Sequence, residues 1–97
     1  MRVRVEYFGT IRDHIPVGFE IVEMPARATV MDVVGRVLTV YGEELGTILL
    51  APQGEPLPNL VLTVNGVRII EPIGMRKELC QEDVVTLLLM PPFTGGG

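Results

Sequence analysis

One cysteine, one histidine and no serine occur in the 97 residues of this sequence. Cys80 cannot form a disulfide within the chain, and it does not cluster with His14 at the spacing of a structural zinc site. Because serine is absent, the chain cannot hold the serine–histidine pair of a serine hydrolase. No glycine-rich loop has the spacing of a phosphate-binding motif. These absences argue against a catalytic domain.

Positive charge is also sparse, and the formal net charge is -4. The eight basic residues are scattered rather than clustered: Arg2, Arg4, Arg12, Arg27, Arg36, Arg68, Arg76 and Lys77. We therefore expect neither nucleic acid nor an anionic membrane surface as a partner.

Long hydrophobic runs are missing as well. The longest apolar stretches are far shorter than a bilayer span. The opening "MRVRVEYF" alternates apolar and charged residues, so it lacks the continuous apolar core of a signal peptide. The expectation from these features is a cytoplasmic protein.

The residues that are present favour one domain with a single core, since 47% are hydrophobic and 97 residues are too few for two domains. Period-two alternation predicts a strand at 2–8, and a β-rich segment at 19–24 predicts its hairpin partner. Prolines and glycines at 43–59 predict an irregular connector with a short helical turn at 45–50. Asn65-Gly66 predicts a second hairpin. The run "VVTLLLM" at 84–90 predicts a strand in the middle of a sheet.

One helix is predicted at 30–41, where apolar residues recur every three or four positions. Thr29 is a good N-cap, Asp32 suits the first turn, and Gly42 is suited to end the helix. Gly35 and five valines weaken its intrinsic propensity, so this helix must depend on packing.

These elements predict an α+β fold in which a mixed four- to five-stranded sheet packs on one main helix. A β-grasp arrangement, with the helix as the right-handed crossover between parallel first and last strands, satisfies the handedness rule. We expect a β-grasp domain at 1–90 and an extended tail at 91–97.

Few side chains outside the tail suggest chemistry. His14 lies in a predicted loop, where a solvated side chain is the expected state. Cys80 is surrounded by carboxylates, which disfavour a reactive thiolate. The acidic residues Glu43, Glu44, Glu78, Glu82 and Asp83 are typical of solvated surface.

The C-terminal "LMPPFTGGG" is different. Taken alone, three terminal glycines are typical of a frayed end. However, Pro91 and Pro92 favour an extended conformation that cannot continue the sheet. From Phe93 to Gly97 the chain reaches about 17 Å, and glycine fits channels that are too narrow for other residues. The group so delivered is the Gly97 carboxylate, which is a poor electrophile until an enzyme converts it to an acyl-adenylate.

The sequence resembles a known family at several positions: "VRVEYFGTIRD", "ATVMDVV", "VNGVRI", "EDVVTLLLMPP" and the terminal glycine pair. It is similar to the MoaD-like sulfur carriers, the small subunits of molybdopterin synthase in the ubiquitin-like β-grasp group. The resemblance implies a carrier rather than an enzyme, with no bound cofactor. In that family, a ubiquitin-activating-type adenylating enzyme would use ATP to adenylate the terminal glycine. A sulfur donor would then convert the adenylate to a thiocarboxylate. The molybdopterin synthase large subunit would use this sulfur to build the molybdenum or tungsten cofactor.

The resemblance also implies roles for individual residues. Gly97 would carry the sulfur, and a tail inserted into partner active sites would comprise Pro91, Pro92, Phe93, Thr94, Gly95 and Gly96. Partner docking is expected at Leu87, Leu88, Leu89 and Met90, about half of which should be core because alternate strand residues point to opposite faces. Two features depart from the family: three terminal glycines instead of two, and Glu82 where a glycine is expected before the last strand.

Two other functions remain open at the level of sequence. A ubiquitin-like modifier joined to lysines of target proteins would need the same activated Gly97. The chain could also be an interaction module. Its terminal glycines would then be inert and would reflect only the ordinary mobility of chain termini. Removing the last two glycines would abolish either carrier function and leave such a module's binding intact.

Overall fold

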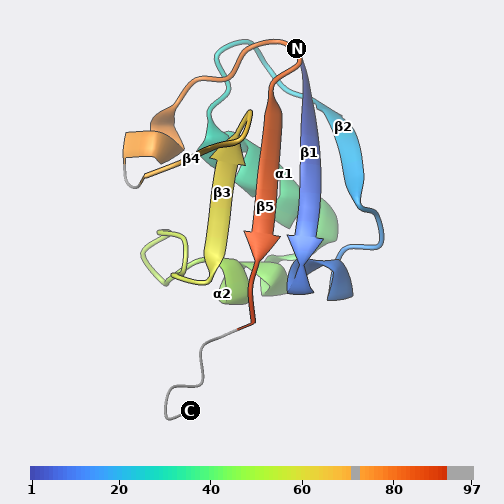
Figure 1. Cartoon of the computed structure of the whole chain (residues 1–97), viewed down its shortest axis with the longest axis vertical. Coiled ribbons are helices and arrows are strands. Elements are labelled where there is room, and N and C mark those ends of the chain that lie inside the picture. Colours follow the sequence, from blue (N-terminus) through green and yellow to red (C-terminus); the bar gives the residue numbers. More distant parts are fainter. Residues whose placement is uncertain (71–72, 92–97) are drawn as a thin grey trace.

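A computed structural model describes residues 1–70 and 73–91, and its central feature is a five-stranded mixed sheet. The strand order is β2-β1-β5-β3-β4. Strands β1 and β5 are parallel neighbours in the middle, whereas the other pairs are antiparallel (Figure 1). The strands are β1 (Arg2–Gly9), β2 (Phe19–Glu23), β3 (Leu60–Val64), β4 (Val67–Arg68) and β5 (Val84–Leu89). The predicted β-grasp architecture is confirmed, with five strands.

Strand β1 forms because its apolar and charged residues alternate with the period of a strand. Val3, Val5 and Tyr7 are buried, whereas Arg4 and Glu6 lie on the other face. A 3-10 helix, η1 (Thr10–Asp13), and a turn connect β1 to its antiparallel partner β2. The predicted first hairpin is therefore confirmed.

Helix α1 (Val30–Tyr41) begins and ends where the sequence predicts. The Asp32 N–H donates to Thr29 Oγ1 at 3.2 Å, and the Thr29 N–H donates to Asp32 Oδ2 at 2.8 Å, which completes a capping box. At the other end the Gly42 N–H donates to the Leu38 carbonyl. At both ends of the helix, backbone groups are therefore hydrogen-bonded to residues three or four positions away.

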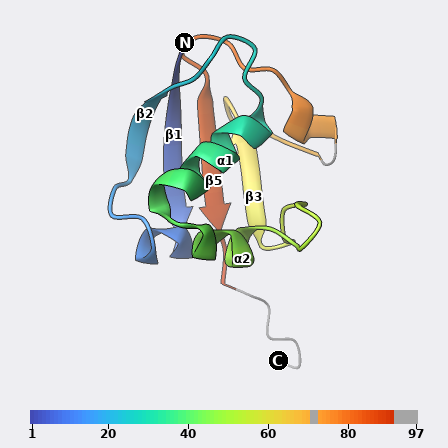
Figure 2. The same cartoon turned by 180° about the vertical axis from the view of Figure 1, so that it is seen from behind.

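Helix α1 lies across one face of the sheet (Figure 2) and leaves the other face uncovered (Figure 1). Val33 and Val34 are fully buried and Val37 is 2% exposed. Burial of each such side chain contributes about 1.5–3 kcal/mol, which exceeds the propensity cost of a valine-rich helix. No helix in the described part of the chain is long and apolar enough to span a membrane.

The connector after α1 contains the short helical turn predicted at 45–50. A 3-10 helix, η2 (Glu43–Leu45), runs into α2 (Gly46–Leu49). The second hairpin is also confirmed, because β3 and β4 pair across Asn65 and Gly66, which both have positive φ angles. Another 3-10 helix, η3 (Ile73–Arg76), precedes β5, which ends at Leu89, one residue before the predicted boundary.

A polar contact joins β1, β2 and α1 at the edge of the core. The hydroxyls of Tyr7 and Tyr41 both donate to Glu20 Oε2 at 2.6 Å, and the two rings meet edge-to-face. Burial, reinforced by the Glu20 carboxylate, raises the pKa of Tyr7 well above its ordinary value and that of Tyr41 to about 12. Both phenols therefore remain protonated donors and fix the end of α1 to the first hairpin.

Candidate functional site

The described part of the chain reaches only the first residue of the predicted tail. Pro91 follows β5 as an exposed residue outside regular secondary structure. The other predicted tail residues lie outside the described residues: Pro92, Phe93, Thr94, Gly95, Gly96 and Gly97. Their roles stay predictions, so the structural question is how the fold positions the point where the tail begins.

We define the strand exit as Gly9, Thr10, Asn59, Leu89 and Met90, the residues that hold the end of β5. The Met90 N–H donates to the Asn59 carbonyl at 2.9 Å, and Asn59 Nδ2 donates to the Met90 carbonyl at 3.0 Å. One asparagine therefore satisfies both backbone groups of the residue that precedes Pro91. This fixes the direction in which the chain leaves the sheet.

The parallel neighbour β1 holds the strand exit from the other side. The Leu89 carbonyl accepts a hydrogen bond from Thr10 Oγ1 at 3.2 Å. Gly9 has φ +78°, and a Cβ on it would lie 2.1 Å from the Leu89 carbonyl oxygen. Glycine is required here because the two backbones approach too closely for any side chain.

The predicted docking residues divide between the two faces of β5. Leu87 and Leu89 are buried in the core, at 0% and 3% exposed. Leu88 is half-buried on the uncovered face, and Met90 continues the same alternation with 42% exposure. Of the four residues, only Leu88 and Met90 are therefore accessible to a partner.

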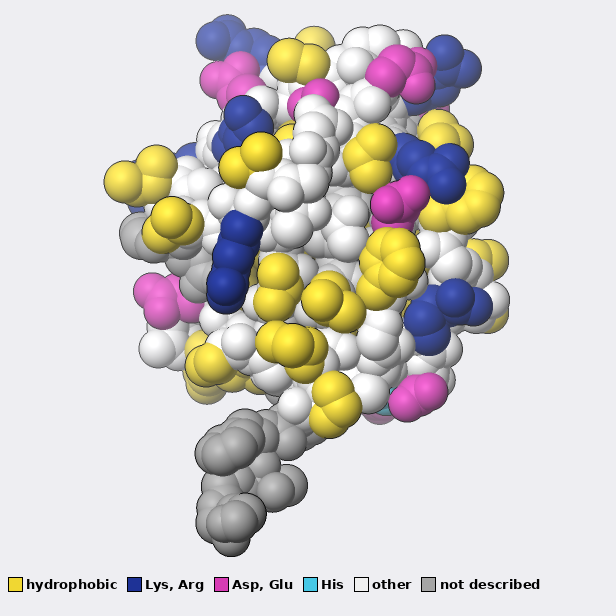
Figure 3. Space-filling model, viewed as in Figure 1, with side chains coloured by type: hydrophobic (Ala, Val, Ile, Leu, Met, Phe, Trp, Pro, Cys, Tyr) yellow, Lys and Arg dark blue, Asp and Glu magenta, His cyan; other side chains and the backbone are white. Residues whose placement is uncertain are grey.

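Leu88 and Met90 belong to a larger apolar surface on the side of the sheet away from α1. Leu88 is in register with Phe8 of β1 on one side and Val61 of β3 on the other, and Phe8 is 50% exposed. We call Phe8, Val61, Leu88 and Met90 the open face. Hydrophobic side chains gather on this side of the molecule toward the end where the tail begins (Figure 3).

Charged groups border the open face on the β2 side. The Arg4 guanidinium carbon lies 3.8 Å from the centre of the Phe19 ring, and Arg4 Nε lies 2.8 Å from Glu6 Oε2. A cation stacked on an aromatic face is attracted by the ring and held in place. The apolar open face is thus bordered on its β2 side by a fixed pair of opposite charges.

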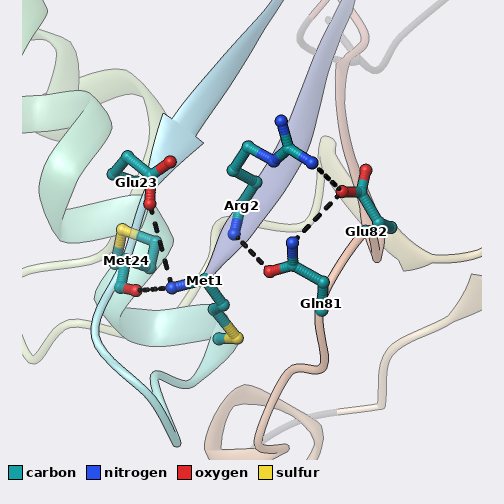
Figure 4. A network of polar contacts seen from close by, with 6 residues as sticks. All are labelled: Met1, Arg2, Glu23, Met24, Gln81 and Glu82. Atoms are coloured by element: carbon teal, nitrogen blue, oxygen red, sulfur yellow. Dashed lines mark hydrogen bonds and ion pairs between the residues drawn. The ribbon is translucent and has the colours of Figure 1, made fainter.

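Glu82 stands where the family resemblance predicts a glycine. Its backbone has φ +69°, a conformation that favours glycine. Its N–H donates to the Arg2 carbonyl at 2.8 Å, and its carboxylate accepts from Arg2 Nη2 at 2.9 Å, while Gln81 accepts from the Arg2 N–H (Figure 4). The next residue, Asp83, accepts from the Cys80 N–H and from Asn65 Nδ2, and these hydrogen bonds lower the pKa of its carboxyl. Contacts to neighbouring strands therefore hold the turn despite the missing glycine.

The remaining candidates do not assemble into a site. His14 and Cys80 are exposed and lie in different loops. No group of three or more metal-ligating side chains occurs within residues 1–70 and 73–91. Glu43 and Glu44 are exposed at the end of α1, and Glu78 pairs with Arg27 at 3.1 Å.

Most of the strand exit is not evident from the sequence. Asn59 lies in the stretch predicted as an irregular connector, and nothing in its neighbours indicates that it bonds to Met90, 31 residues away. Gly9 and Thr10 fall within "VRVEYFGTIRD", which carries part of the family resemblance, but their contact with Leu89 depends on the parallel pairing of β1 and β5.

Neither a protein-family model nor a curated protein sequence matches this chain. The strand order, the central parallel pair and the covering helix define a ubiquitin-like β-grasp protein. Solved structures confirm this class. One is SAMP1, the small archaeal modifier protein 1, from Haloferax volcanii, with TM-score 0.79 and 18% identity over 99% of this chain and 100% of that chain.

Two further neighbours have somewhat higher identity. The HVO 2177 protein from Haloferax volcanii has TM-score 0.78 and 27% identity over 99% of this chain and 87% of that chain. A candidate molybdopterin converting factor, subunit 1, from Pyrococcus furiosus has TM-score 0.72 and 24% identity over 96% of this chain and 99% of that chain. The expected structural resemblance to MoaD-like proteins is thereby confirmed.

Proposed function

We propose that this protein is a sulfur carrier that donates sulfur for the synthesis of molybdopterin, the organic part of the molybdenum or tungsten cofactor. The observation that carries the proposal is the strand exit, in which Asn59 and Thr10 bond the backbone of the two residues preceding Pro91. A rigid domain that fixes the base of an extended glycine tail is suited to deliver a carboxyl group to other proteins' active sites. The β-grasp fold shared with a candidate molybdopterin converting factor subunit supports the same reading.

The proposed chemistry takes place at Gly97. A ubiquitin-activating-type enzyme joins the carboxylate to AMP with release of pyrophosphate, and a sulfur donor then displaces AMP to leave a thiocarboxylate. The molybdopterin synthase large subunit receives the loaded tail. The chain itself is the carrier in this scheme, and ATP is bound by the activating enzyme.

Intact-mass spectrometry tests this function directly. After incubation with ATP, the cognate adenylating enzyme and a sulfur donor, we expect one terminal oxygen to be replaced by sulfur. A variant that lacks Gly96 and Gly97 is the control and should remain unmodified. The activity of the cognate adenylating enzyme is verified separately on another substrate. If the full chain remains unmodified although this enzyme is active, the carrier function is wrong.

The open face is proposed to dock the partner enzymes, through Leu88 and Met90 rather than through the buried Leu87 and Leu89. Met90→Glu should weaken binding to the adenylating enzyme by about tenfold or more, because it places a charge in an apolar interface. Val40→Glu is the matched control, since Val40 is 54% exposed on α1, on the other side of the molecule. Equal effects of the two variants would contradict docking at the open face.

A second candidate is a ubiquitin-like modifier, which the structural similarity to a protein named small archaeal modifier protein 1 favours. The activated Gly97 would then form an amide with lysines of other proteins. In the same mass-spectrometry experiment, carried out with a cell extract, lysine-linked adducts without sulfur would identify this function.

A further inference from the structure

Lys77 is the only lysine in the sequence. It directly follows η3 and is exposed. Its backbone is fixed on both sides, because its N–H donates to the Gly74 carbonyl and its carbonyl accepts from the Val30 N–H at the start of α1. The chain thus presents one lysine amine at a defined place.

The other amine of the chain, at Met1, is engaged in the fold. Its nitrogen donates to the Met24 carbonyl at 2.7 Å and lies 3.8 Å from the Glu23 carboxylate, and the Met1 side chain is only 10% exposed (Figure 4). These contacts, together with the low exposure of Met1, restrict access to its amine, whereas Lys77 is exposed. Lys77 is therefore the better acceptor for an activated carboxyl group.

Lys77 also lies on the rim of an apolar groove of about 580 Å³ beside β4 and η3. Val67, Ile70 and Ile73 contribute to it with 71%, 79% and 81% of their surfaces exposed. Arg68 is a second cation on the rim. Ion pairs among the described residues involve neither Arg68 nor Lys77.

We propose that Lys77 is the acceptor for self-conjugation, and that the groove seats the C-terminal tail of a second copy. The sequence of the tail complements the groove, since Pro91, Pro92 and Phe93 are apolar, and Arg68 would attract the anionic phosphate of the Gly97 adenylate. Volumes of about 300–1,000 Å³, on the order of this groove, are typical of binding pockets. This inference rests on the proposed activation of Gly97.

The topology favours a tail from another molecule. Asn65, in the turn before β4, bonds to Val84 at the start of β5, whereas the tail leaves from the opposite end of β5. The length of β5 separates these ends by about 20 Å. Figure 1 shows η3 and the exit of β5 toward different ends of the molecule. A tail of the same molecule, about 27 Å long from Met90 to Gly97 when extended, would have to turn back along β5 to reach Lys77, whereas the tail of a second copy would not.

The reaction is an acyl transfer that needs no oxidant or reductant. The unprotonated Lys77 Nζ attacks the carbonyl carbon of the Gly97 adenylate of another copy. The C–N bond forms as the C–O bond to AMP breaks, AMP leaves with the electron pair, and the nitrogen releases one proton to solvent. The product is an isopeptide-linked dimer whose donor molecule still has its own free Lys77.

The test uses the full chain carrying a Gly97 thioester, made by intein cleavage, so that it does not depend on an activating enzyme. We expect dimers and longer chains with Gly97 joined to Lys77 in tandem mass spectra. Lys77→Arg should reduce them at least about tenfold. A relocated-lysine variant, Lys77→Arg with Arg36→Lys, places the amine on the exposed side of α1 and should also conjugate about tenfold less. Ile73→Glu, at an 81% exposed position of the groove, should give a similar reduction while Lys77 remains.

Several outcomes would overturn the inference. These are linkage at the Met1 amine, a cyclic monomer, equal conjugation by the relocated-lysine variant, and absence of dimers while added free lysine is acylated by the same thioester. A parallel reaction with ATP and the adenylating enzyme tests the proposed function separately. Thioester-driven dimers without enzymatic activation would refute the proposed function and leave the acceptor assignment in place.

Discussion

Replacement of Gly9 by alanine tests the strand exit most severely. The backbone at Gly9 has φ +78° and ψ -151°, a region that non-glycine residues enter at a cost of about 1–3 kcal/mol. The new Cβ would also lie 2.1 Å from the Leu89 carbonyl oxygen, so the ends of β1 and β5 must move apart. The hydrogen bond from Thr10 to that carbonyl, worth about 1 kcal/mol, would then be lost.

These contributions together predict that Gly9→Ala lowers the free energy of unfolding by about 3 kcal/mol. With a urea dependence of about 1–3 kcal/mol per molar, the midpoint of urea unfolding should fall by about 1–3 M. Gly42→Ala is the matched control, because Gly42 has φ +104° but no atom within 4 Å of the position that a Cβ would occupy. It should show the conformational cost alone, about 1–3 kcal/mol, without the clash and the lost hydrogen bond.

The difference between the two alanine variants isolates the close approach of β1 to β5. Equal midpoints for Gly9→Ala and Gly42→Ala would refute the reasoning, because the backbone contact with Leu89 would then contribute nothing. If the contact does fix the strand exit, Gly9→Ala should in addition slow modification of Gly97 under conditions in which the variant remains folded.

Three further predictions concern the turn before β5 and the start of α1. Glu82→Gly should stabilise the protein by about 1 kcal/mol, since glycine adopts φ +69° without strain; a lower melting temperature would mean that the Arg2 contact outweighs the strain. The lowered pKa of Asp83 means that its ionised form stabilises the fold above the ordinary aspartate pKa, and that this contribution is lost as the pH falls through the lowered value. As the pH is lowered, the free energy of unfolding should therefore fall less steeply for Asp83→Asn than for the wild type. An equal dependence on pH for the two proteins would contradict the assignment. Thr29→Ala removes the N-cap of α1 and should cost about 1 kcal/mol, or about 4–8 °C in melting temperature; an unchanged melting temperature would show that the cap is dispensable.

Local patterns determined much of this fold. The recurrence of apolar residues and the capping pair Thr29 and Asp32 predicted both ends of α1, because these signals act between residues three or four positions apart. Asn65-Gly66 predicted the second hairpin for the same reason, since the turn depends on the φ angles of two adjacent residues. The resemblance also predicted a glycine at position 82, and the positive φ angle of Glu82 is one that favours glycine.

The tertiary structure decided what those local patterns left open. "VVTLLLM" is apolar at positions of both parities, so the sequence could not show that Leu87 and Leu89 are core whereas Leu88 and Met90 face outward. That assignment depends on which face of the sheet α1 covers.

The sequence by itself thus determined the elements, the β-grasp prediction and the glycine tail as the feature that suggests a carrier. Only the tertiary structure brought Asn59 to Met90 and Gly9 to Leu89, and placed Lys77 beside an apolar groove. The physical reason is range: caps, turns and periodicity arise between near neighbours, whereas the strand exit depends on the pairing of strands that are far apart in the chain.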